Sequence, residues 1–166
     1  MCLCSFITNR KTMKDKEKQR TLDWRYMRMA DIWAENSYCQ RRKVGALIVK
    51  DKMIISDGYN GTPSGFENIC EDENNVTKTY VLHAEANAII SAEREKMIDS
   101  TLYLVGKEVG TGAYIEKSSS CSMCKRMVIN AGIKQVVIRD TENEYRVIDV
   151  QDWIENDESL EGSFGY

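Results

Sequence analysis

Residues 43–61, KVGALIVKDKMIISDGYNG, contain two runs of aliphatic and β-branched residues that are separated only by Lys-Asp-Lys. Runs of this length and composition are typical of β-strands, and so short a connection joins strands that lie antiparallel. The segment therefore predicts a β-hairpin. The sequence NGTPSG ends it and holds the only proline of the chain, Pro63, so a turn is predicted there.

The rest of the chain alternates between helix and strand patterns. Helices are predicted over about residues 22–37, 83–97 and 121–132, strands over 100–106 and 134–140, and an edge strand with a short helix over 144–157. The polar, acidic segment 66–80 is predicted to be a loop beside a cleft. This order predicts one α/β domain whose mixed sheet carries helices on both faces.

The composition indicates a single globular domain. The chain has 166 residues, of which 42% are apolar and 30% charged. We expect residues 1–20 to form a disordered arm, 21–158 the domain and 159–166 a frayed tail. The net charge of −3, with no basic tract beyond the lysine-rich arm, argues against a nucleic-acid partner. No apolar run approaches the roughly 20 residues of a membrane span, so no membrane partner is expected.

The N-terminal residues lack the order of a signal peptide, which predicts a cytoplasmic protein in a reducing compartment. The six cysteines are then expected to be free thiols or metal ligands rather than disulfides. Cys2 and Cys4 lie in the arm and are not expected to belong to the main site.

Cys121 and Cys124 are three residues apart at the start of a predicted helix, so both thiols project to one side and can reach one metal ion. The positive end of a helix also lowers the pKa of a thiol, and zinc binds thiolates. A single Cys-x-x-Cys pair is equally consistent with a redox pair or with two small packing residues. The pair is therefore a candidate metal site that needs further ligands.

The only histidine, His83, stands at the head of another helix pattern, and Glu85 follows two residues later. Both motifs open helices that follow sheet-side segments, so their N-termini can converge at one end of the sheet. One histidine and two cysteines leave a fourth zinc position for water, which is the pattern of a catalytic site. Glu85 would then be free to move protons; the alternative is an acid that only stabilises the helix N-terminus.

These motifs, with the strand VGALIV and the loop GYNGTPSG, resemble the zinc-dependent cytidine and deoxycytidylate deaminases. The resemblance extends over roughly residues 22–140, and SYCQRRKVGALIV and GYNGTPSG are similar to segments of the deoxycytidylate (dCMP) branch. It implies a three-layer α/β/α fold of the cytidine deaminase type with a five-stranded mixed sheet. It also implies that His83, Cys121 and Cys124 bind one Zn²⁺ and that Glu85 is the general acid and base.

The reaction implied is the hydrolytic deamination of dCMP to dUMP and ammonia, which supplies dUMP for dTTP synthesis. Water activated by zinc attacks C4 of the ring, while Glu85 delivers protons to N3 and to the leaving amino group. Cytidine, cytosine, guanine and tRNA adenosine remain alternative substrates, and a catalytically silent zinc-binding domain is the alternative from another class. The retained Glu85 and the lack of a second histidine argue against the silent domain.

For substrate binding, the resemblance implies that Asn60 hydrogen-bonds the sugar and that the backbone of Ala84 lies beside the pyrimidine. Gly58 and Gly61 would let the backbone approach the substrate, although a plain turn is the alternative for this segment.

A 5′-phosphate is best held by a guanidinium, and Arg41 and then Arg42 are the candidates, each with a solvated surface charge as its alternative. Tyr103 is expected either to line the pocket or to belong to the core.

The sequence departs from the family at a few positions. Ser120 stands before the first zinc cysteine, where the family usually has proline, and the serines there are expected to cap the helix. The segment 106–120 is longer than expected and is either a lid over the site or an insertion without effect. A second, structural zinc would need Cys39, Cys70 and an acid such as Glu71, and we favour buried thiols for both cysteines.

The resemblance further implies a homo-oligomer, with a hexamer favoured, and control by the effectors dCTP with Mg²⁺ and dTTP. No residue pattern assigns the effector site.

Overall fold

The computed structural model describes residues 3–162, with side chains described from residue 12 onward. The helices are α1 (Leu3–Ala34), α2 (Ala84–Ile90), α3 (Arg94–Met97), α4 (Ser122–Ala131) and α5 (Val150–Asn156), followed by a 3-10 turn, η1 (Glu158–Leu160). The strands are β1 (Arg42–Lys50), β2 (Met53–Tyr59), β3 (Thr101–Glu108), β4 (Gln135–Arg139) and β5 (Tyr145–Asp149). The hairpin and the closing strand–helix pair lie where the sequence predicts them.

The five strands form one mixed sheet in the order β2-β1-β3-β4-β5. β3 and β4 are parallel, and the other neighbouring pairs are antiparallel. Asp51 and Lys52 turn the chain between β1 and β2 with φ angles of 50° and 66°, as a tight hairpin requires. The predicted five-stranded mixed sheet is confirmed.

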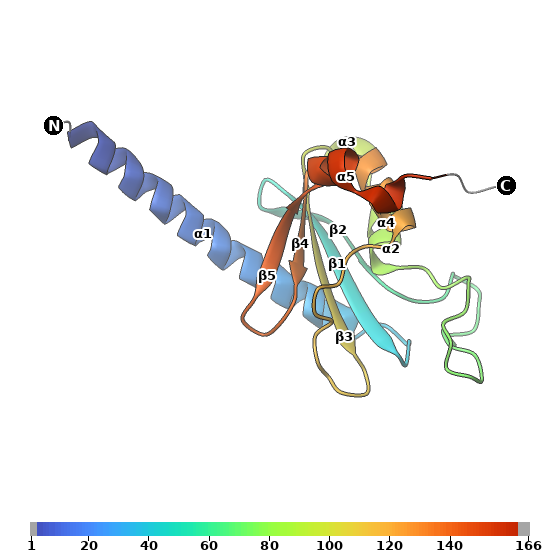
Figure 1. Ribbon diagram of the computed structural model, residues 1–166. Helices are drawn as coiled ribbons and strands as arrows, with labels where there is room; N and C mark the ends of the chain where they lie inside the picture. The colour runs from blue at the N-terminus through green and yellow to red at the C-terminus, as the bar shows by residue number, and fades with distance from the viewer. Residues whose placement is uncertain (1–2, 163–166) are drawn as a thin grey trace.

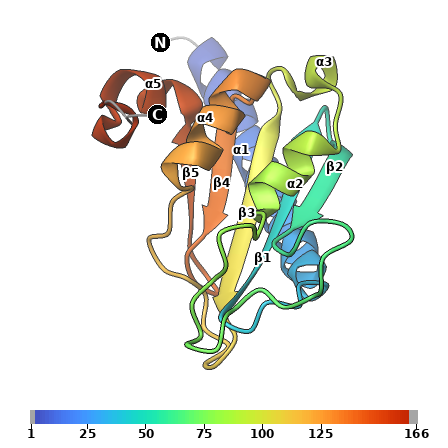
Figure 2. The ribbon, with the colours of Figure 1, turned by 90° about the vertical axis from the view of Figure 1, so that its right-hand side faces the viewer.

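Helices cover both faces of the sheet, which confirms the predicted three layers (Figure 2). α1 packs on one face and buries Met27 and Ala30 there. α2, α4 and α5 cover the opposite face, where Ala88, Val128 and Trp153 belong to the larger core cluster. Burial of these apolar side chains on each face is the main term that holds the layers together.

α1 is longer than predicted, because it begins at Leu3 rather than near residue 22. Residues 3–34 contain no glycine or proline and are rich in lysine, arginine, glutamate and glutamine before residue 20, all of which favour a helix. The arm predicted to be disordered is therefore helical from Leu3, and α1 extends well beyond the sheet (Figure 1). Cys2 and the side chain of Cys4 lie outside the described residues. No helix in the described part of the chain is long and apolar enough to span a membrane.

Two further segments differ from the sequence prediction. The helix expected over 83–97 is split into α2 and α3 by residues 91–93, where the backbone of Glu93 is extended, with φ −71° and ψ 133°. The tail was expected to fray from residue 159, but its beginning is bound to α4. Lys125 Nζ lies 2.5 Å from Asp157 Oδ2 and 3.2 Å from Ser159 Oγ. Residues 163–166 of that tail lie outside the described range.

Candidate active site

The first helix start of the site is that of α2, where His83 is the N-cap residue. Gly58 on β2 allows α2 to lie close to the sheet, because a Cβ atom there would come within 2.5 Å of the Ala84 carbonyl oxygen and the Ala88 nitrogen. Two hydrogen bonds reinforce the contact, from Ser56 Oγ to the Ala88 carbonyl at 2.6 Å and from Asn87 Nδ2 to the Tyr59 carbonyl at 2.7 Å. The β2–α2 contact thus sets the position of His83, and this close contact requires glycine at position 58.

The second helix start is that of α4, where Cys121 is the N-cap residue and Cys124 lies in the first turn. α4 ends at Gly132, whose φ of 79° is the left-handed conformation that glycine adopts without a Cβ penalty. The end of the helix predicted from Gly132 is confirmed. Cys121 is exposed and Cys124 buried.

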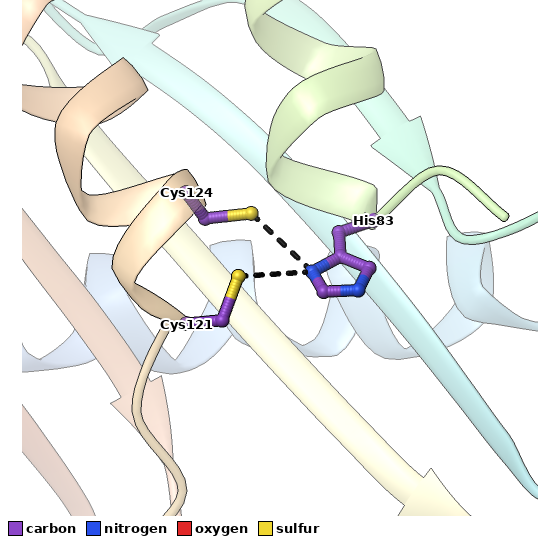
Figure 3. Close-up of side chains that lie close together, drawn as sticks. All are labelled: His83, Cys121 and Cys124. Atoms are coloured by element: carbon purple, nitrogen blue, oxygen red, sulfur yellow. Dashed lines mark hydrogen bonds between the residues drawn. The ribbon is translucent and has the colours of Figure 1, made fainter. Parts of the chain in front are cut away.

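The two helix starts bring the three predicted metal ligands together. His83 Nδ1 lies 3.4 Å from Cys121 Sγ and 3.4 Å from Cys124 Sγ (Figure 3). All three donor atoms lie within 4.8 Å of one another. Nitrogen and sulfur ligands of a tetrahedral zinc are roughly 3.6 Å apart, given metal–ligand distances near 2.1 and 2.3 Å. The donor set and its spacing therefore fit Zn²⁺, with three protein ligands and room for a fourth.

The surroundings of Cys124 also favour the binding of a cation next to its sulfur. Burial, followed by the nearby Glu85 carboxylate and Cys121, raises the pKa of the Cys124 thiol well above its usual range. A thiolate at this position is stable only when a positive charge compensates these effects. A divalent metal ion held by the neighbouring His83 and Cys121 is such a charge.

Glu85 lies in the first turn of α2 and its side chain is buried. Ser120 Oγ donates a hydrogen bond to Glu85 Oε1 at 2.8 Å. The prediction that the serines cap α4 is wrong for this hydroxyl, because the N-cap Cys121 has no side-chain cap and Ser120 turns to Glu85 instead. Sequence reasoning missed this contact; the only signal was a serine in place of the proline usual in the family.

His83 and Cys121, two of the three metal-ligand candidates, line a cavity of about 350 Å³. Of the substrate-binding candidates, Asn60, Ala84 and Arg41 line it, as do Glu85 and Arg42. Lining residues that the sequence analysis did not single out for the site are Val44, Thr77, Val81, Leu104, Ile115, Ser118 and Ser119. They come from loops and alternate strand positions whose convergence depends on the tertiary fold.

Asn60 is held rigidly against β1. Its Oδ1 accepts from the Val44 N–H at 2.8 Å, and its Nδ2 donates to the Arg42 carbonyl at 2.9 Å. An amide side chain has one further donor hydrogen and one further acceptor lone pair, so Asn60 retains hydrogen-bonding capacity toward the cavity.

Gly61 and Tyr103 do not line the cavity. Gly61 forms a two-way backbone bridge with Leu82, and a Cβ atom at this position would meet only Tyr59, at 4.0 Å, so the position does not require glycine. Tyr103 lies on the α1 face of the sheet, where its hydroxyl donates to Asp23 Oδ1 at 2.7 Å and its ring packs on Tyr26. Neighbouring residues of a strand point to opposite faces, and its neighbour Leu104 is the one that reaches the cavity.

The two arginines of the cavity differ in their partners. Arg42 pairs with Glu108 at 2.7 Å, whereas the Arg41 guanidinium makes, among the described residues, only a long hydrogen bond of 3.4 Å to Thr77 Oγ1. Glu71 also lines the cavity, but its carboxylate accepts from the backbone N–H groups of Gln40 and Arg41 at 3.0 to 3.1 Å. Arg41 is therefore the cation of this cavity that is free to meet an anion.

Cys39 and Cys70 form a disulfide, with Cα atoms 5.1 Å apart. The preference for buried thiols was wrong, and so was the expectation that no disulfide forms. The fold brings the two residues within bonding reach although 31 positions separate them in the sequence. Within the described residues, the only group of three or more potential metal ligands is His83, Cys121 and Cys124, so a second zinc at Cys39 and Cys70 is not supported.

The segment 106–120 is a closed loop rather than a free lid. Backbone bonds from Ile115 to Gly106 and from Glu108 to Ala113 extend β3 into a tight hairpin. Tyr114 anchors it, because its hydroxyl donates to Asp31 Oδ2 of α1 at 2.7 Å. The loop then presents residues of its second half to the cavity wall.

Known proteins share this sequence pattern and fold. The model of the cytidine and deoxycytidylate deaminase zinc-binding region matches residues 20–140. The deoxycytidylate deaminase of Mycobacterium phage D29 is 30% identical over 131 residues, which cover 69% of this chain and 93% of that protein. The deoxycytidylate deaminase of Saccharomyces cerevisiae is 31% identical over 149 residues, covering 80% of this chain but 44% of that longer protein.

Solved structures agree. The dCMP deaminase of cyanophage S-TIM5, in complex with dCMP and dUMP, is 34% identical with a TM-score of 0.58, covering 81% of this chain and 86% of that one. The cytidine deaminase of Burkholderia pseudomallei, 20% identical with a TM-score of 0.54, shares the fold. From the family match, the phage relatives and the converging histidine and cysteines, the chain belongs to the cytidine and deoxycytidylate deaminase family, whose zinc-binding region it carries.

Proposed function

We propose that this chain catalyses the hydrolytic deamination of dCMP to dUMP and ammonia and thereby supplies dUMP for dTTP synthesis. The observation that carries the proposal is the buried Glu85 carboxylate in a cavity that also contains His83 and Cys121. The deoxycytidylate deaminases among the similar proteins, one of them solved with dCMP and dUMP, support the choice of substrate.

In this mechanism His83, Cys121 and Cys124 would hold zinc, which would supply the Lewis acidity that activates a water molecule for hydrolysis. Glu85 would accept a proton from the attacking water as its oxygen bonds to C4, and would pass this proton to N3 of the cytosine ring. The same carboxyl group would then take the remaining proton from the oxygen on C4 and deliver it to the amino group, so that the C4–N bond breaks and ammonia leaves. Glu85 is only 5% exposed, which limits the access of bulk water to its carboxyl group.

The substrate contacts follow from the partners of each residue. Arg41 meets the 5′-phosphate, because it is the cavity cation without an ion pair, and Glu71 does not oppose this because backbone N–H groups already hold its carboxylate. Asn60 uses its spare amide hydrogen and lone pair on the sugar. The backbone of Ala84, at the positive end of α2, lies beside the pyrimidine.

A substrate panel tests the proposal: ammonia release is measured from dCMP, CMP, deoxycytidine, cytosine and guanine with the zinc-loaded protein. We expect dCMP to have the highest kcat/KM.

Arg41→Ala is expected to lower kcat/KM for dCMP by about 10- to 100-fold through loss of a charge-assisted contact, and to leave kcat/KM for deoxycytidine unchanged. Arg28→Ala, an exposed arginine on the opposite face, is the matched control. A preference for unphosphorylated compounds would contradict the role of Arg41, and bound zinc without any turnover would favour a silent zinc-binding domain.

Regulation, assembly and location complete the proposal. The family resemblance supports a homo-oligomer, with a hexamer favoured, activated by dCTP with Mg²⁺ and inhibited by dTTP. Size-exclusion chromatography with light scattering tests the oligomeric state, and initial rates with each effector test the regulation.

A cytoplasmic location is also proposed. It conflicts with an oxidised Cys39–Cys70 pair, so alkylation of thiols in freshly lysed cells tests the location and the disulfide together.

A further inference from the structure

Ser120 immediately precedes the candidate metal ligand Cys121, and its side chain contacts the Glu85 carboxylate. The hydroxyl of Ser120 donates to Glu85 Oε1 at 2.8 Å, and the two residues are only 4% and 5% exposed. In the described part of the chain, this is the only hydrogen bond to the Glu85 carboxylate. A buried bond to a charged oxygen is among the stronger protein hydrogen bonds.

One such bond has a large effect on orientation, because the terminal torsion of a glutamate side chain is broad and roughly two-fold. A hydrogen bond at Oε1 breaks this equivalence of the two oxygens. It leaves Oε2 as the oxygen without a protein partner, in a residue that lines the cavity. A group that must both take up and deliver a proton benefits from one fixed geometry.

The Ser120 hydroxyl is itself held in place from both sides. On the preceding side, Arg146 donates to the Ser118 carbonyl at 2.5 Å and pairs with Asp140 at 2.6 Å, while Asp140 also accepts from the Lys117 N–H at 2.9 Å. On the following side, Cys121 is the N-cap residue of α4, and its backbone carbonyl accepts from the Lys125 N–H at 2.9 Å. The segment that ends the 106–120 loop is thus fixed to the sheet, and a fixed backbone presents the hydroxyl to Glu85 in one position.

We propose that Ser120 is a positioning residue for Glu85: its hydroxyl fixes Oε1 and so directs Oε2 to the reacting atoms. The role rests on the proposed deaminase function and goes beyond it, since it assigns part of the proton-transfer geometry to a loop residue outside both signature motifs.

The experiment compares Ser120→Ala, Ser120→Thr and the control Ser100→Ala. Ser100 is a buried serine whose Oγ has no hydrogen-bond partner among the described residues, so its replacement removes a buried serine hydroxyl away from the site. The readouts are kcat and KM for dCMP, bound zinc per chain and the thermal midpoint. Ser120→Ala is expected to lower kcat per bound zinc by about tenfold with KM changed by less than about twofold. Ser120→Thr keeps a hydroxyl and should restore most of kcat, and Ser100→Ala should match the parent.

Three results would overturn the role of Ser120. One is an unchanged kcat per bound zinc in Ser120→Ala; another is a raised KM at constant kcat, which would make Ser120 a substrate contact; the third is an equal loss in Ser120→Thr. If the parent prefers another compound of the panel, the same comparison on that compound tests Ser120 separately from the substrate assignment. A zinc-loaded parent without any turnover would overturn both proposals.

Discussion

The two faces of the sheet do different work, and β3 shows the contrast within two residues. Tyr103 points to the α1 face and bonds Asp23, which also accepts from Tyr145 Oη at 3.1 Å. Leu104 points to the other face and lines the cavity beside Glu85. Polar groups on the α1 face are thus satisfied by one another, whereas those on the cavity face are left with capacity for a metal and a substrate. Changes on the first face should alter stability, and changes on the second should alter catalysis.

Removal of the metal is expected to give the largest difference between the two faces of the sheet, because it should affect only the cavity face. Dialysis against a zinc chelator is expected to abolish deamination and to leave the α1 face folded, because none of the contacts described for that face involves His83, Cys121 or Cys124. Ammonia release reports on the cavity face. Near-UV circular dichroism reports on the other, where Trp24 and Tyr145 pack edge to face at 5.2 Å. Full activity in protein shown to be free of metal would contradict the proposed zinc role.

Glu85→Gln keeps the shape of the side chain and removes its ability to transfer protons. We expect kcat for dCMP to fall by about 10²- to 10⁴-fold, the usual contribution of general acid–base catalysis. Zinc content and the thermal midpoint should stay at parental values, since the ligand set is unchanged. Retention of parental kcat would remove Glu85 from the mechanism.

The Cys39–Cys70 disulfide crosses from the wall of the cavity to the loop before α2, so its loss affects stability first. A link that closes 31 positions of sequence is worth about 3–4 kcal/mol of unfolding free energy in the chain-entropy model. Denaturant unfolding of the oxidised parent and of the double variant Cys39→Ser/Cys70→Ser measures this difference. Equal midpoints for the two proteins under oxidising conditions would show that the bond does not form in solution.

Tyr103→Phe tests the prediction that a change on the α1 face alters stability and not catalysis. Burial and the bond to Asp23 raise the pKa of Tyr103, so it remains a neutral donor throughout the working range. Loss of this bond to a carboxylate should lower the unfolding free energy by about 1.5–3 kcal/mol, with kcat and KM for dCMP unchanged. A raised KM in this variant would instead return Tyr103 to the substrate pocket.

Local patterns predicted most of the elements and the three metal-ligand candidates. Features that depend on residues close in sequence can be deduced from spacing. They include the hairpin of β1 and β2, the end of α4 at Gly132, and the position of Cys121 and Cys124 on one side of a helix start. Periodicity did not reveal the break between α2 and α3, because hydrophobic spacing does not report the extended backbone of Glu93 between the two helices.

The sequence by itself determined the family and predicted the chemistry, from one histidine, one Cys-x-x-Cys pair and one glutamate at the heads of two helices. Only the tertiary structure decided which face Tyr103 occupies, that Cys39 bonds Cys70, that Arg42 rather than Arg41 pairs with Glu108, and that Ser120 reaches Glu85. Each of these outcomes depends on side chains far apart in sequence that meet only when the layers pack, and no local pattern encodes that meeting.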